Sequence, residues 1–325
     1  MTNTTTLRAS GGPNWSHRLK DAGFWAEWAA LVGLLVLVIV FQALNPTFLS
    51  PGNIASMLVA AAILVILAVG QTFVIATAGI DLSIASVMTL GAVVFGQMYQ
   101  AGLGLGVASL MAVVSAGAAG AVNGVIVARG KITDFIVTLG MLSAASGLAL
   151  ILSDGKPVTV IDPLLLRLST TGIGIFGWSF VIAIVVAVVA HVVLFHTRFG
   201  THLLATGGSP ESATAMGIST ARIKIAVYLI SGLLAGLGAI LLVGRIGAAE
   251  PAANTAFLLN SVAAVVLGGV SLFGGRGTIV GPFFGALLLI ALVNGLTLLG
   301  VSQFYQPLAV GIVVVLAALL MRFQK

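Results

Sequence analysis

Long apolar runs recur along the chain and predict its secondary structure. A helix that crosses a bilayer needs about 20 mostly apolar residues, whereas a transmembrane strand needs about 10 residues of alternating polarity. The runs here are continuous, as in "FVIAIVVAVVAHVVLF" at 180–195. They predict ten spanning helices, at 28–44, 53–77, 83–99, 105–128, 133–152, 176–195, 222–244, 256–272, 278–299 and 304–321.

The composition supports the same class of protein. Hydrophobic residues make up 59% of the 325 positions and charged residues 7%, where a soluble domain carries about 25% charged residues. A chain this apolar cannot cover itself with polar surface, so we expect an all-α polytopic membrane protein. It contains no cysteine, which excludes disulfides and thiolate metal sites.

Lysine and arginine are distributed unevenly over the connections between these spans. With a cytoplasmic N-terminus, 11 of the 14 basic residues lie on the cytoplasmic side. Only Lys156, Arg167 and Arg245 lie outside. The positive-inside rule therefore predicts that both termini are cytoplasmic. Residues 1–27 form a cytoplasmic tail, 28–325 the transmembrane domain, and the net charge of +6 reflects topology and not nucleic-acid binding.

Two segments of the chain resemble each other at a constant spacing. "AVNGVI" (121–126) and "LVNGLT" (292–297) share Val-Asn-Gly at an offset of 171, and a similar offset pairs Asp81 with Glu250. Spans two to five then correspond to spans seven to ten. A shift of five spans reverses orientation, so we predict an inverted repeat, which many transporter folds contain.

Asp81 lies within the apolar stretch "VIATAGIDLSIASVMTLGAVV" (74–94). A carboxylate at membrane depth needs partners or a cavity. We expect Gly79 to break the helix and Ser83 to cap the next one. Asp81 then either orders this broken helix, which we favour, or couples transport to substrate or protons. Gly274 and Gly275 predict another tight cytoplasmic turn, next to Arg276.

Enzyme motifs are missing from the sequence. No segment reads G-x-x-x-x-G-K-[ST], so the chain has no P-loop for ATP. "GIGIFG" (172–177) precedes an apolar span and is a chance match to a dinucleotide motif. His191, His196 and His202 are spaced five and six residues apart, which does not align them on one helical face. We therefore expect no catalytic residue, metal ligand or cofactor in this chain.

The connection at 196–221 is the most informative loop. Ser209 suits a helix N-cap, Pro210 the first helical position and Gly217 the end. A helix this short is not stable alone, so it rests either on its own protein or on a soluble partner. For the second case we expect Ala213 and Ala215 to be exposed for docking, with Glu211 beside them.

The chain resembles the permease subunits of ribose-type bacterial ABC importers, the second carbohydrate-uptake class. The resemblance runs from about residue 45 to the end and is carried by "AGIDLSIASVMTLGAVV", "TDFIVTLGMLSAASGLAL", "TRFGTHLLATGGSPESATAMGI" and "LNSVAAVVLGGVSLFGGRGTIVGPFFGALLL". It implies a type II importer fold with ten spans in the bacterial plasma (inner) membrane. It also implies two permease copies, a cytoplasmic ATPase that binds ATP and Mg²⁺, an extracytoplasmic sugar-binding protein, and a coupling helix within 196–221.

The resemblance makes an ATP-driven sugar importer permease the leading hypothesis. Candidate pathway residues are polar groups on glycine-rich spans, each equally suited to hydrogen bonding between helices: Gln71, Thr72, Asn123, Ser143, Asn260 and Asn294. A permease for a branched-chain amino acid, a nucleoside or a signalling furanose is the nearest alternative. From other classes, a proton-coupled carrier would use Asp81, and a passive pore would need no binding protein.

Overall fold

The computed structural model describes residues 22–252 and 255–322. Ten of its helices correspond one to one to the predicted spans: α2 (Ala22–Leu44), α3 (Pro51–Ala76), α4 (Ile84–Gln100), α5 (Gly104–Gly130), α6 (Asp134–Leu152), α8 (Trp178–His196), α11 (Thr220–Ile246), α12 (Thr255–Leu267), α13 (Val280–Leu298) and α14 (Gln306–Arg322). The prediction of an all-α polytopic protein is confirmed. Most of the predicted tail lies outside the described residues.

The helices differ in length. Six of them, α3, α5, α6, α8, α11 and α13, are long and apolar enough to cross a membrane. Shorter apolar segments are Trp28–Leu44 of α2, α4, α12 and Gln306–Leu316 of α14. Our expectation of a span over 256–272 is wrong at its end, because α12 has 13 residues, about 20 Å at 1.5 Å per residue. It stops before Gly268 and Gly269, and Gly269 adopts a left-handed φ of 77°.

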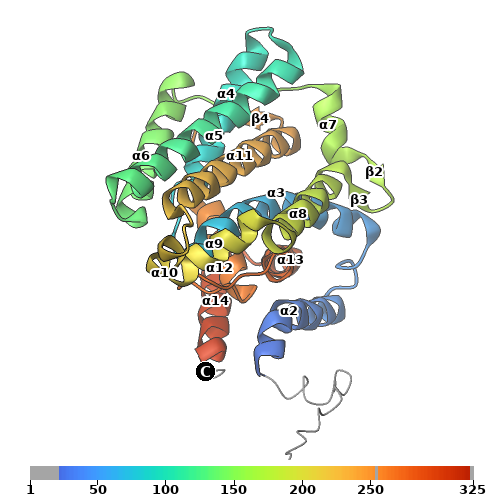
Figure 1. Cartoon of the computed structure of the whole chain (residues 1–325). Helices are drawn as coiled ribbons and strands as arrows, with labels where there is room; N and C mark the ends of the chain where they lie inside the picture. Colours follow the sequence, from blue (N-terminus) through green and yellow to red (C-terminus); the bar gives the residue numbers. More distant parts are fainter. Residues whose placement is uncertain (1–21, 253–254, 323–325) are drawn as a thin grey trace, which may run out of the picture.

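Helix α3 forms the centre of the molecule. Every residue from Ala61 to Ala76 is buried, and α3 packs against α8, α11, α12 and α13 (Figure 1). This explains its uniform apolar character, since a helix that is apolar on all sides is one that is covered on all sides.

Helices α5 and α11 cross at glycines. A Cβ on Gly120 would lie 2.3 Å from the Tyr228 carbonyl oxygen, and one on Gly232 would lie 2.4 Å from the Ala116 carbonyl oxygen. The patterns "GAVNG" (120–124) and "GLLAG" (232–236) therefore face each other. Small residues at this crossing let the two backbones approach closely.

The connections gather at two ends of the bundle. At one end, β1 (Val158–Thr159) pairs antiparallel with β4 (Ala248–Ala249), and Asn45 donates to the carbonyl of Leu298. The helix α7 (Pro163–Thr170) and the hairpin of β2 (Gly172–Ile173) and β3 (Phe176–Gly177) lie in the same connection as β1. The connections predicted to be extracytoplasmic therefore contact each other.

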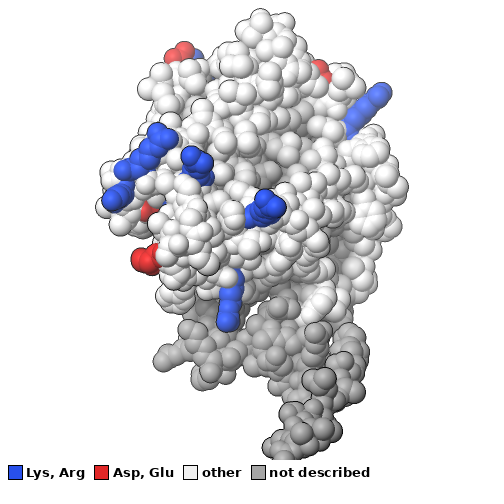
Figure 2. Space-filling view, in the orientation of Figure 1, with Lys and Arg blue, Asp and Glu red and all other residues white. Residues whose placement is uncertain are grey.

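The opposite end holds α9 (Arg198–Gly208) and α10 (Pro210–Ala215). There the backbone N–H of Gly275 donates to the Ala76 carbonyl at 3.0 Å, which joins two connections predicted to be cytoplasmic. Figure 2 shows lysine and arginine side chains gathered over the side where α9 and α10 lie. Exposed basic residues at this end are Arg129, Lys131, Arg198, Arg222 and Arg276.

The predicted internal repeat pairs Asn123 with Asn294 and Asp81 with Glu250. Only the two asparagines are alike in their surroundings. Asn123 and Asn294 both bond another helix, Asn123 to Ser83 and Asn294 to Asn53. Asp81, in contrast, is buried while Glu250 is exposed. The repeat itself stays a prediction.

Candidate functional site

The chain between α3 and α4 is interrupted at Asp81. Helix α3 ends at Ala76, and Ala78 adopts a left-handed φ of 57°, so our expectation that Gly79 makes the break is wrong. Gly79 instead lies at a close approach of three side chains. A Cβ there would lie 3.2 Å from the Asp134 carboxylate, the Tyr228 hydroxyl and Val74.

The Asp81 carboxylate is buried and accepts three hydrogen bonds. Oδ1 accepts from the Ser83 backbone N–H at 2.9 Å and from the Ser83 hydroxyl at 2.6 Å. Oδ2 accepts from the Ser231 hydroxyl of α11 at 2.9 Å. The expectation that the Ser83 side chain caps α4 is wrong, because Ser83 precedes α4 but its hydroxyl forms no capping bond. Ser83 fixes Asp81, and Asp81 joins the break to α11.

Two further polar side chains complete this cluster. The Asn123 amide of α5 donates to the Ser83 hydroxyl at 2.9 Å, and the Gln71 amide of α3 donates to the Asp81 carbonyl at 3.3 Å. Both are buried, and Gln71 Oε1 and Asn123 Oδ1 lack a hydrogen-bond partner. The sequence suggested Gln71 and Asn123 as pathway residues, and the structure brings them together at the interrupted helix.

The other candidate pathway residues lie apart from this cluster. Buried Thr72 donates to the Ala68 carbonyl of its own helix, and Asn294 exchanges two hydrogen bonds with Asn53. Ser143 is exposed on α6, and Asn260 is half-buried on α12. Within the described residues no hydrogen bond joins these four side chains to one another, and their part in a pathway stays a prediction.

The connection 196–221 folds into two helices where the sequence predicted one. Helix α9 was missed, because "TRFGTHLLATGG" contains three glycines and five polar residues. In α10 the Ser209 hydroxyl accepts from Ser212 N–H, and Pro210 is the first residue. Gly217 follows at φ 82°, and its N–H donates to the Thr214 carbonyl.

The side chains of α10 divide into a buried and an exposed set. Ala213 is buried against its own protein, so our expectation that it is exposed for docking is wrong. The spacing of the helix turns Ala213 inward and leaves Glu211 and Ala215 outward. Met216, which the sequence analysis did not single out, is 69% exposed. The sequence signal that could have identified Met216 is a large apolar residue directly after a short polar helix.

Glycines connect these helices to the end of α3. A Cβ on Gly207 of α9 would lie 1.9 Å from the Ala76 carbonyl oxygen and 2.7 Å from Gly275 N. Gly274 and Gly275 have left-handed φ values of 76° and 73°, which gives the tight turn that the sequence predicted. We call Ala76, Gly207, Gly274 and Gly275 the glycine junction. It places α9 directly against the helix that leads to Asp81.

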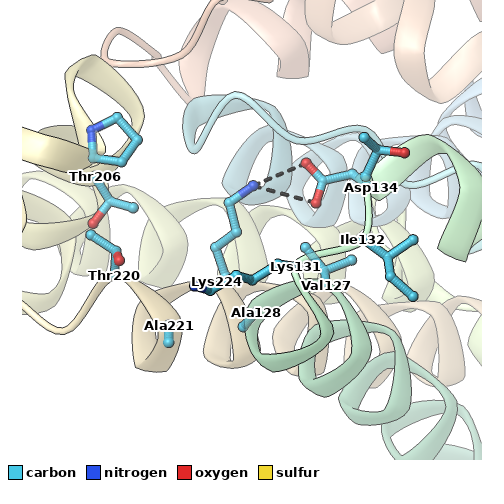
Figure 3. A pocket seen from close by; sticks show the side chains of 11 residues that line it. Val127, Ala128, Lys131, Ile132, Asp134, Thr206, Thr220, Ala221 and Lys224 are labelled. Carbon is cyan, nitrogen blue, oxygen red and sulfur yellow. Dashed lines mark hydrogen bonds and ion pairs between the residues drawn. The ribbon is translucent and has the colours of Figure 1, made fainter.

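A pocket of about 320 Å³ opens beside α10 (Figure 3). It lies between the end of α5, the start of α6 and the start of α11, and Pro210 and Thr206 also line it. Lys224 of α11 points to Asp134 of α6, and Nζ lies 2.9 Å from Oδ2 (Figure 3). Sequence analysis missed this ion pair because its partners are 90 positions apart.

At the opposite end Asp162 caps α7. Its carboxylate accepts from the N–H groups of Leu164 and Leu165 and from the Tyr99 hydroxyl of α4. The bond from Leu165 N–H is the main reason that the pKa of Asp162 lies below its ordinary value. Among the residues that the structure describes, no group of three His, Cys, Asp or Glu side chains could hold a metal ion.

Helices long enough to span a bilayer, joined through a buried polar cluster, define a polytopic membrane protein. The family described as "Branched-chain amino acid transport system / permease component" matches residues 53–320. The ribose import permease protein RbsC of Escherichia coli (strain K12) is 40% identical over 330 residues, 97% of this chain and 98% of that protein. RbsC of Bacillus subtilis (strain 168) is 37% identical over 313 residues, 94% of this chain and 95% of that protein.

A permease named for another sugar is also similar. The L-arabinose ABC transporter permease protein AraH of Azospirillum brasilense is 35% identical over 300 residues, 90% of this chain and 87% of that protein. No solved structure matches the chain. The chain belongs to this family of ABC importer permeases and is a multi-pass protein of the bacterial inner membrane.

Proposed function

We propose that this chain is the permease subunit of an ATP-driven importer and forms the translocation pathway for a monosaccharide. The observation that carries the proposal is similarity over nearly the whole chain. Permeases named for ribose and for L-arabinose match 97% and 90% of it. A match of this extent includes the spans, the Asp81 break and α10 together.

The energy for transport has to come from another subunit, because the sequence has no P-loop. ATP and Mg²⁺ bind to a separate cytoplasmic ATPase, and an extracytoplasmic binding protein delivers the sugar. Two permease copies, identical or paralogous, enclose the pathway. Alternating access then requires that each partner bind the two conformations of the permease with different affinities.

The end of the bundle that carries α9 and α10 is the side proposed to face the ATPase. Support comes from the exposed side chains of Glu211, Ala215 and Met216 and from the basic residues around them, which the positive-inside rule puts in the cytoplasm. Through the glycine junction, α9 contacts the end of α3. A displacement of α10 would therefore reach the end of α3, next to the Asp81 break, through α9.

The alternatives have less support. A proton-coupled carrier needs a carboxylate that exchanges its partners, but Asp81 accepts three bonds from within the chain. The family description names branched-chain amino acids, whereas RbsC and AraH are named for sugars. A monosaccharide is therefore favoured over an amino acid.

Reconstitution tests the proposal. The permease is placed in proteoliposomes with its ATPase and its sugar-binding protein, and uptake of labelled ribose, arabinose and leucine is measured. We expect uptake of a sugar only when ATP and the loaded binding protein are both present. Uptake without the ATPase that collapses with the proton gradient would establish a carrier. Flux in both directions without the binding protein would establish a pore.

A further inference from the structure

The pocket between α5, α6 and α11 contains one cation without a partner. Its charged lining groups are Lys131, Asp134 and Lys224. Lys224 and Asp134 form an ion pair, so their charges balance. Within residues 22–252 and 255–322, Lys131 forms no ion pair, and its side chain is exposed. The pocket therefore carries one unbalanced positive charge.

The backbone holds Lys131 at the mouth of the pocket. Lys131 is the C-cap of α5 and adopts a left-handed φ of 53°, which turns the chain sharply. Only Lys131, Ile132 and Thr133 separate α5 from α6. The position of the Lys131 backbone is thus defined by two long helices, and not by a loose loop.

An exposed apolar surface begins next to this cation. Phe135 and Ile136, in the first turn of α6, are 56% and 61% exposed, and Ile132 is 43% exposed. In a membrane protein, an apolar surface of this kind is solvated by lipid chains. A cation directly beside it lies at the level of the headgroups. The juxtaposition of charge and apolar surface matches the two parts of a phospholipid.

We propose that this pocket binds the phosphate-bearing headgroup of an anionic phospholipid, with Lys131 as its charged contact and α6 as the surface for its acyl chains. Basic pockets between transmembrane helices on the cytoplasmic side are suited to such headgroups. The exposed Arg129, two residues before Lys131, adds positive charge outside the pocket. The proposal concerns lipid binding and does not depend on which solute is transported.

Lipid binding to the purified full-length permease tests the proposal. Binding of phosphatidylglycerol is titrated by native mass spectrometry, with zwitterionic phosphatidylcholine, which has no net charge, as the control. We expect Lys131→Asn to weaken phosphatidylglycerol binding about fivefold, the effect of one cation near an anionic surface. Asparagine also tolerates a left-handed φ, so the α5 cap is kept. Arg276→Gln removes an exposed cation at the same end and should leave binding unchanged.

Several results would overturn the proposal. Equal losses in Lys131→Asn and Arg276→Gln would mean a diffuse charge effect. Full competition by inorganic phosphate would mean a site for free anions. If Lys131→Asn leaves lipid binding unchanged but weakens association of the ATPase or of a second permease copy, this surface binds protein and not lipid. If Lys131→Asn does not fold, Ile132→Ser, which removes apolar surface, should also weaken binding, and no change there would count against the lipid.

Discussion

Asp81 is held by one residue that is close in the sequence and by one that is far away. Its carboxylate receives one hydroxyl from its own turn and one from Ser231, 150 positions later. Burying a carboxylate is costly unless hydrogen bonds compensate, and here three do. Its arrangement favours the ordering role that we expected over a role in direct coupling. The break between α3 and α4 is thereby fixed against α11.

The first prediction concerns this carboxylate. Asp81→Asn should fold and keep part of the transport activity, because an amide oxygen still accepts from Ser83 and the amide nitrogen can donate to Ser231. Asp81→Leu should lower the folded yield, since each buried donor left without an acceptor costs about 1–3 kcal/mol. Yield, thermal unfolding and uptake are measured together. An Asp81→Asn protein that folds and assembles normally but transports nothing would assign Asp81 a direct role.

Helix-capping rules, which use only neighbouring residues, predicted the positions of some residues. They could not predict which distant residues become hydrogen-bond or ion-pair partners. Ser209, Pro210 and Gly217 follow capping rules that depend only on neighbours in sequence, and the structure gives them the expected positions. The partners of Asp81 and the ion pair of Lys224 depend on tertiary packing. Neither could be predicted from spacing along the chain.

At the level of the helices, the sequence predicted where the spans lie but not how they pack against each other. Apolar runs identified ten helices because burial in lipid requires continuous hydrophobicity. Helix α9 was missed and α12 was predicted too long, because glycine has opposite effects on the helix in these two segments. In α9 Gly207 permits a close contact within a helix, whereas Gly269 ends the turn after α12. A sequence does not distinguish these uses.

Adjacent glycines of α9 give a matched test of the glycine junction. Gly207→Ala would place a methyl group 1.9 Å from the Ala76 carbonyl oxygen, whereas Gly208→Ala would meet nothing closer than 3.8 Å. We expect Gly207→Ala to lower the free energy of unfolding by about 1–3 kcal/mol and to reduce transport. Gly208→Ala should resemble the parent. Similar behaviour of the two variants in thermal unfolding and in uptake would show that the contact is unimportant.

Helix α10 gives a prediction about the ATPase. Ala215→Trp adds bulk to an exposed position, so the permease should insert normally while the ATPase no longer co-purifies. Ala213→Trp should instead lower the folded yield, because Ala213 is buried. Glu211→Ala removes at most an exposed ion pair, an effect of about 0–1 kcal/mol.

A tryptophan at the opposite end is the control for the ATPase experiment. Gln303 is exposed there, and Gln303→Trp should keep the ATPase bound. If the Ala215→Trp complex assembles and hydrolyses ATP like the parent, α10 is not the coupling helix.

For the whole molecule, the number and order of the predicted spans indicated which connections lie at the same end. Connections on the same predicted side contact each other, as β1 with β4 and Gly275 with Ala76 illustrate. Which of the two ends is cytoplasmic stays a prediction of the positive-inside rule. The rule gives no information on which helices are central, since lipid-facing and protein-facing helices are both apolar.

Cysteine labelling tests the orientation, and the chain offers a clean background because it contains no cysteine. Ile161 is 78% exposed, whereas neighbouring Val160 is 1% exposed and unsuitable. An impermeant thiol reagent added to intact cells should label cysteine at position 161 or 305. It should not label cysteine at position 212. Labelling of position 212 from outside would reverse the topology.

The central place of α3 has a consequence for biosynthesis. The ribosome produces α3 before α8, α11, α12 and α13, the helices that surround it in the finished protein. Gln71 and Asp81 therefore enter the membrane while Asn123 and Ser231 are still untranslated. A nascent chain truncated before residue 220 should consequently be retained by the insertion machinery or degraded. Only after α11 has been made can Ser231 donate its hydrogen bond to the Asp81 carboxylate.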